Sequence, residues 1–177
     1  AATASGFLAD HDDELRARYD ALPGEVRVWF EGGRVSPHFV QLGVIAPDYW
    51  RWPTQPPDTL APYIGPMRGP LSQIRDASAN AEVIVVSVPH GAYTQASAQA
   101  DLTALGFDVP PDLLSNTFVD EAIASAADET GLPFVAVTDM FRTEETPLFY
   151  AVDGHFNAAG NRQLADALLP TVRDTCT

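Results

Sequence analysis

The sequence contains no lysine and only one cysteine, and both absences limit what the protein can do. All ten basic residues are arginine, against 24 acidic residues, which gives a formal net charge of −14. Nucleic acids and anionic lipid surfaces are bound through clustered Lys and Arg, so this charge balance argues against both as partners. Cys176 alone cannot form an internal disulfide or complete a zinc motif, which needs several Cys or His at set spacings.

Long apolar runs are also missing. No stretch approaches the ~20 apolar residues that a membrane-spanning helix needs, and the chain does not open with a basic segment followed by an apolar one, as a signal peptide would. A mature exported protein looks the same once its leader has been cleaved. We therefore expect no membrane partner and an extracellular or periplasmic location, with a cytoplasmic location left open.

The length and composition favour one globular domain. A chain of 177 residues falls within the usual size of a single domain. With 46% apolar and 19% charged residues, it can bury a core and is unlike a disordered polyelectrolyte. Its few histidines match no metal-ligand spacing, so we expect neither a metal nor another cofactor.

Hydrophobic patterning predicts an α/β fold. The runs 83–88 and 134–138 are apolar almost throughout and rich in β-branched residues, which is typical of strands buried on both faces of a parallel sheet. Residues 26–30, bounded by two glycines, are predicted to form a further strand. Helical spacing of apolar residues predicts helices over 8–22, 68–80, 95–105, 118–130 and 157–169. This alternation predicts a parallel sheet with helices on both faces.

Residues 35–70 differ from the rest of the chain because they combine many prolines with several aromatic residues. Long connecting segments of this kind are usually functional or disordered. The aromatic residues favour an ordered insertion that serves as a lid or pocket wall. The alternative, that they simply cover the core, stays open.

A candidate catalytic pair precedes the last predicted helix. Asp153 and His155 are separated by one glycine, and a carboxylate at this spacing can hold the Nδ1–H of the imidazole. The ring would then keep one tautomer and leave Nε2 as a general base. Asn157 stands where a helix N-cap is expected. On these residues alone, a surface loop with a capping asparagine is the favoured interpretation.

The run DGHFNAAGN at 153–161 resembles the last sequence block of the SGNH (GDSL-type) hydrolases. Its Asp-to-His spacing is most similar to the branch that contains polysaccharide O-acetyltransferases. Segments 4–6, 28–34 and 85–90 loosely resemble earlier blocks, in the same order. The resemblance implies a three-layer α/β/α, flavodoxin-like domain. It also implies a serine-type acyl-ester hydrolase or O-acyltransferase that acts on short acyl esters, such as acetylated carbohydrate.

The resemblance also assigns roles to individual residues. His155 would be the general base, oriented by Asp153. Gly6 and Gly33 would lie at the oxyanion hole, although Gly33 stands where the family has an asparagine donor. The residues that we expect to bind substrate are Trp50, Trp52, His90 and Tyr93.

The family's first block, which places the nucleophilic serine after Gly-Asp at the end of the first strand, has no counterpart here. We therefore expect 1–177 to be one incomplete SGNH-like domain that lacks the first strand, with that strand and the serine on a segment or second chain outside this sequence. Ser5, Ser36 and Ser87 are poor substitutes for the missing nucleophile by their positions. The alternative from another functional class is a non-catalytic SGNH-like module that binds glycan or a protein partner.

Overall fold

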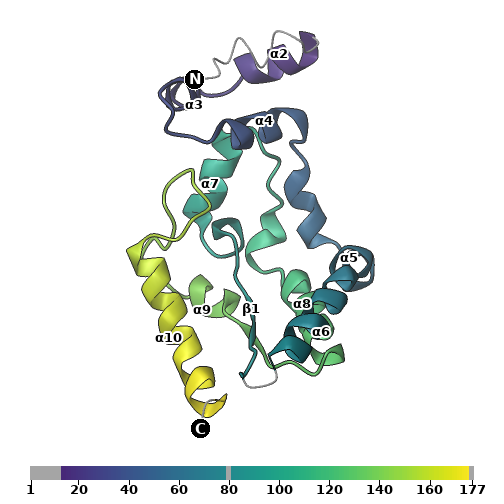
Figure 1. Ribbon diagram of the computed structural model, residues 1–177. Coiled ribbons are helices and arrows are strands. Elements are labelled where there is room, and N and C mark those ends of the chain that lie inside the picture. The colour runs from purple at the N-terminus through teal and green to yellow at the C-terminus, as the bar shows by residue number, and fades with distance from the viewer. Residues whose placement is uncertain (1–12, 79–80, 176–177) are drawn as a thin grey trace.

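The computed structural model describes residues 13–78 and 81–175, which form a mostly helical chain around a small parallel sheet (Figure 1). Strands β1 (Val85–Ser87) and β2 (Phe134–Ala136) pair in parallel, with Val85 opposite Phe134. The helices are α2 (Asp13–Asp20), α3 (Gly24–Glu31), α4 (Pro37–Ile45), α5 (Pro57–Ile64), α6 (Arg68–Ala77), α7 (Ala96–Ala104), α8 (Phe118–Glu129), α9 (Thr138–Arg142) and α10 (Ala158–Thr175). Four short 3₁₀ turns complete the chain: η1 (Tyr49–Thr54), η2 (Gly65–Met67), η3 (Gly91–Tyr93) and η4 (Pro111–Leu114).

The sheet confirms the predicted mixed α/β class and the parallel pairing. Val86 and Val135 pack against the cluster formed by α9 and α10, whereas Val85 and Phe134 pack against α8. Successive side chains of a strand point to opposite faces, so different helices cover the two faces. This arrangement explains why both strand sequences are apolar almost throughout. Over the described ranges the sheet has two strands, fewer than a flavodoxin-like sheet requires.

The strand predicted at 26–30 is wrong, because these residues belong to helix α3. Val26 and Phe30 are buried, and Val28 is 65% exposed. Residues four apart lie on one face of a helix, whereas a strand would place Val28 on the same face as Val26. Burial of Val26 and Phe30 in the core with Tyr19 therefore selects the helix.

The Pro-rich segment 35–70 is ordered, as predicted, and it is largely helical. Pro57 occupies the first position of α5, where its missing N–H costs no hydrogen bond. The side chain of Trp50 is only 6% exposed and packs in the largest core cluster, with residues of α2, α3, α4 and α7. Trp52 is 40% exposed. Covering the core is therefore the role of Trp50, whereas Trp52 is free to contact a ligand.

The other predicted helices are found close to their expected bounds. The described part of 8–22 contains α2, and α6, α7 and α8 occupy the three central ranges. Helix α10 continues to Thr175, beyond its predicted end. Pro170 lies within this helix and does not end it. None of the described helices combines the length and the hydropathy that a bilayer crossing requires.

Replacement of Trp50 by alanine tests its place in the core. We expect Trp50→Ala to lower the free energy of unfolding by about 3–5 kcal/mol, as expected for truncation of a large buried aromatic side chain. Trp52→Ala is the matched control and should cost much less. Chemical denaturation of both variants measures the difference, and equal small losses would contradict the burial of Trp50.

Candidate functional site

The loop between α9 and α10 carries the Asp153–His155 pair. Phe149 and Phe156 form an isolated antiparallel bridge that closes the loop. The backbone N–H of Tyr150 donates to the carbonyl of His155, and that of Asp153 donates to the carbonyl of Tyr150. These bonds give the loop a defined shape without a regular strand.

Within this loop the two side chains of the pair are in contact. His155 Nδ1 lies 2.5 Å from Asp153 Oδ1, which also accepts the backbone N–H of His155 at 2.9 Å. Partial burial raises the pKa of Asp153, but the ring and backbone hydrogen bonds from His155 outweigh it, and the net pKa lies below its ordinary value. The carboxylate therefore stays ionised and favours the Nδ1–H tautomer. Because the imidazole is 88% exposed, Nε2 faces solvent and can accept a proton from a group that approaches.

Asn157 fixes the start of α10 directly after this pair. Its Oδ1 accepts the backbone N–H groups of Ala159 and Gly160 at 2.8 and 3.0 Å, which is the expected N-cap. Its Nδ2 donates to the carbonyl oxygens of Pro147 and Phe149. A β-carbon at Gly160 would collide with the carbonyl oxygen of Leu148. The first turn of α10 is therefore packed tightly against the strand-like segment that begins the loop.

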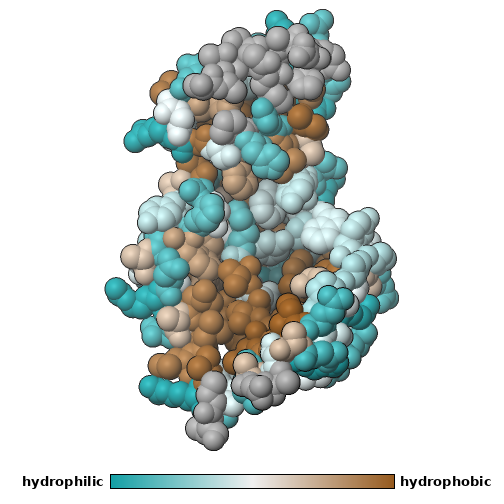
Figure 2. All heavy atoms as spheres, in the orientation of Figure 1, coloured by the Kyte–Doolittle hydropathy of each residue, from teal (hydrophilic) through white to brown (hydrophobic). Residues whose placement is uncertain are grey.

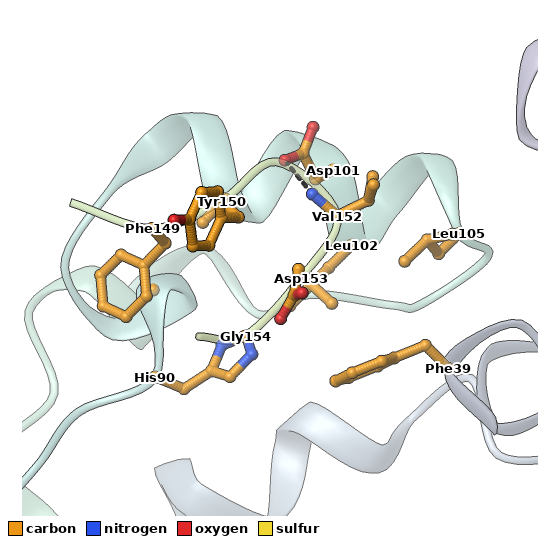
Figure 3. Close-up of a pocket in the computed structure, with 12 residues that line it drawn as sticks. Phe39, His90, Asp101, Leu102, Leu105, Phe149, Tyr150, Val152, Asp153 and Gly154 are labelled. Atoms are coloured by element: carbon orange, nitrogen blue, oxygen red, sulfur yellow. Dashed lines mark hydrogen bonds between the residues drawn. The ribbon is translucent and has the colours of Figure 1, made fainter. Parts of the chain in front are cut away.

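The residue before the pair has a strained backbone. Val152 has a φ of 53°, in the left-handed region that β-branched residues avoid, and such strain costs roughly 1–3 kcal/mol. Its N–H donates to Asp101 Oδ2 of α7 at 3.0 Å (Figure 3). A hydrogen bond to a charged acceptor contributes about 1.5–3 kcal/mol, enough to offset the strain.

His90 lies under the loop in an aromatic box. Its ring centroid is 4.7 Å from that of Trp50 and 6.4 Å from that of Phe39, and both of these rings are tilted against it. It stacks on Phe149, with centroids 6.4 Å apart. The ring Nδ1 accepts the N–H of Ala92 at 3.2 Å. The Nε2 atom is buried without a hydrogen-bond partner.

Close packing also joins this box to the loop that carries Asp153 and His155. A β-carbon at Gly154 would lie only 2.8 Å from His90 Nε2, so the glycine between Asp153 and His155 lets the loop approach the ring. Burial lowers the pKa of His90 to about 4, although the charge of Asp153 opposes this shift. His90 is therefore neutral at ordinary pH.

Two cavities meet at His90. A small one of about 20 Å³, which is room for a single water molecule, is lined by Asp153, Gly154, Phe39 and Asp101, among others (Figure 3). A larger one of about 310 Å³ follows β1 and is walled by η1 and α8. The larger cavity brings together all four residues predicted to bind substrate: Trp50, Trp52, His90 and Tyr93.

The other predicted site residues lie elsewhere. Gly6 falls outside the described residues. Gly33 follows α3 with a φ of 68° and lines neither cavity. Among the serines, Ser87 is buried and hydrogen-bonded to Asp120, and Ser36 precedes α4. Over 13–78 and 81–175, no group of three or more His, Cys, Asp or Glu side chains is placed to hold a metal ion.

Sequence reasoning missed two residues that shape the site, Asp101 and Gly154. Gly154 lies within the recognised motif, and a glycine between two reactive side chains could have signalled a close approach. Asp101 lies on helix α7, 51 residues before Val152. Helical spacing gives no sign of such a contact.

The low pKa of His90 makes stability depend on pH. An unfolded chain protonates this ring near its ordinary pKa of 6.5, whereas the folded protein does so only near 4. Protons therefore favour the unfolded state, and the His90 contribution to stability falls as pH drops from 6.5 to 4.

We expect His90→Phe to remove this part of the pH dependence. Unfolding midpoints of the variant and of the native protein across this range measure the effect. A slope unchanged by His90→Phe would contradict this assignment.

Comparison with known proteins identifies no relative of this chain. No protein-family model matches the chain, and searches of curated proteins and of solved structures find no significant match. The functional argument therefore rests on the residues and their arrangement.

Proposed function

We propose that this chain supplies the Asp–His part of a serine-type acyl-ester hydrolase or O-acyltransferase of SGNH type, with the nucleophilic serine on a segment outside this sequence. The observation that carries the proposal is the contact between His155 Nδ1 and Asp153 Oδ1 at 2.5 Å, on an imidazole that is otherwise exposed. A loop that only caps α10 would require Asn157, but it would not require His155 to keep one tautomer.

The residues of the pair have defined chemical roles in this proposal. His155 Nε2 takes the proton of the serine hydroxyl as the hydroxyl attacks the ester carbonyl, and it later returns a proton to the leaving alcohol. Asp153 stays ionised, holds Nδ1–H and stabilises the imidazolium that forms. For hydrolysis, water then attacks the acyl-serine, and for transfer a second alcohol does so. By the family resemblance, the backbone N–H of Gly6 would supply one oxyanion donor, and Gly33 stands where the family has a second.

The edge of β1 that faces away from β2 carries no strand over residues 13–78 and 81–175, which supports the pairing of a further strand there. The N–H of Val85 donates to the carbonyl of Pro133 beside β2, so the backbone groups of Val86 face the opposite edge. Residues 85–90 line the larger cavity along their length. In the view of Figure 2, apolar side chains gather over the lower half of the molecule. The proposed extra strand would pair here, extend the sheet toward a flavodoxin-like arrangement and bring the serine to the strand ends.

The aromatic residues near η1 support a carbohydrate ester as substrate. Tyr49, Trp52 and Tyr63 are all exposed, and the rings of Trp52 and Tyr63 meet edge to face with centroids 5.6 Å apart. Exposed aromatic faces suit stacking on sugar rings. The same surface supports the second candidate, a non-catalytic module that binds glycan. An intact dyad that holds one tautomer favours the enzyme over this module.

An Asp153→Asn variant of the complete, serine-bearing protein tests the proposal. The amide keeps the shape of the side chain but stabilises the wrong tautomer of His155, so turnover of p-nitrophenyl acetate should fall by about 10⁴-fold, as in other triads. The thermal midpoint should change little, because the pair is largely exposed.

Asp112→Asn provides the control, because it makes the same chemical change at an exposed aspartate away from the loop. It should leave the turnover unchanged. Full activity of Asp153→Asn, or a loss of stability without a loss of turnover in the folded fraction, would favour the capping loop instead.

A further inference from the structure

One carboxylate, that of Asp101, links the strained backbone at Val152 to helix α7. Asp101 is half-buried on α7 at the edge of the small cavity, and its Oδ2 accepts the N–H of Val152 (Figure 3). A valine with positive φ relaxes toward an extended backbone unless the surrounding structure prevents it. Asp153 is the next residue, so a rotation at Val152 would swing the Asp153 carboxylate directly.

Helix α7 holds the same loop at a second point. The side chain of Gln95, the residue before α7, donates from Nε2 to the carbonyl of Thr146 at 2.9 Å and accepts the N–H of Leu148 at Oε1 at 3.0 Å. The segment 146–152 is therefore fixed to α7 at both ends. Of these two attachments, only the one at Asp101 lies next to the catalytic pair.

We propose that Asp101 is a positioning residue for the Asp153–His155 pair. It keeps Val152 in the left-handed conformation, and this conformation directs the Asp153 carboxylate toward His155 Nδ1. Asp101 does not itself touch the imidazole or a reacting atom in this account. The catalytic consequence rests on the proposed function, whereas the geometric claim concerns the described chain alone.

The geometric claim can be tested without any activity, by following the carboxyl ¹³C signal of Asp153 during a pH titration of the full chain. In the native protein, hydrogen bonds from His155 keep the pKa of Asp153 below its ordinary value. Asp101→Ala should return it toward that value, because the loop relaxes. Asp101→Asn should preserve the native titration, since the amide oxygen can accept the same N–H. Asp128→Ala, at an exposed position on α8, should also preserve it.

A double variant separates positioning from general stabilisation. Glycine adopts positive φ without strain, so Val152→Gly should make Asp101 dispensable. The double variant Asp101→Ala with Val152→Gly should titrate Asp153 as the native protein does, even where Asp101→Ala alone fails to fold. A double variant that still shows the ordinary pKa of Asp153 would overturn the proposal, as would a native titration in folded Asp101→Ala.

Kinetics then distinguish this proposal from the proposed function. In the complete enzyme, Asp101→Ala should lower kcat by about 100-fold with little change in KM, because the misplaced group acts in the chemical step. A shifted Asp153 titration without any loss of turnover would contradict the catalytic role of the pair and leave Asp101 as its positioning residue. A native titration would overturn the role of Asp101 whatever the turnover.

Discussion

The left-handed backbone at Val152 is the constraint on which the arrangement of the candidate site depends. An aspartate two residues before a histidine is common in flexible loops, where it has no fixed geometry. Here α7 holds the N–H of Val152, Asn157 ties the loop to the start of α10, and Gly154 lies against the His90 ring. These contacts hold the carboxylate and the imidazole on a rigid support, as a catalytic pair requires.

The aromatic box links this loop to the rest of the fold. His90 follows β1, packs on Trp50 from η1 and on Phe149 from the loop, and lines both cavities. Trp50 in turn belongs to the core formed by α2, α3, α4 and α7. The larger cavity and the hydrophobic core thus share the side chain of Trp50, so the position of the loop depends on the packing beneath it. The edge of β1 that faces away from β2 has no strand partner over the described residues, and β1 runs along the larger cavity that His90 also lines.

Sequence reasoning succeeded where the signal is local and failed where it depends on distant contacts. The apolar runs around β1 and β2, the helix periods and the cap at Asn157 are local patterns, and the structure confirms them. Residues 26–30 were wrongly predicted as a strand because Val26, Val28 and Phe30 fit its alternation. Val26 and Phe30 alone also fit a helical period, and only the core decides that Val28 stays exposed. Asp101 and the conformation of Val152 could not be predicted, because the contact spans 51 residues. The location of the serine and the width of the complete sheet stay predictions.

Labelling of the protein purified from its native source with a fluorophosphonate probe, followed by intact-mass and peptide analysis, tests the central claim most directly. The account predicts one adduct, on a serine outside residues 1–177, and its disappearance in His155→Ala while the protein stays folded. An unlabelled native protein would contradict the claim, and so would equal labelling of the native protein and His155→Ala. Either of these results would leave the glycan-binding module as the better account.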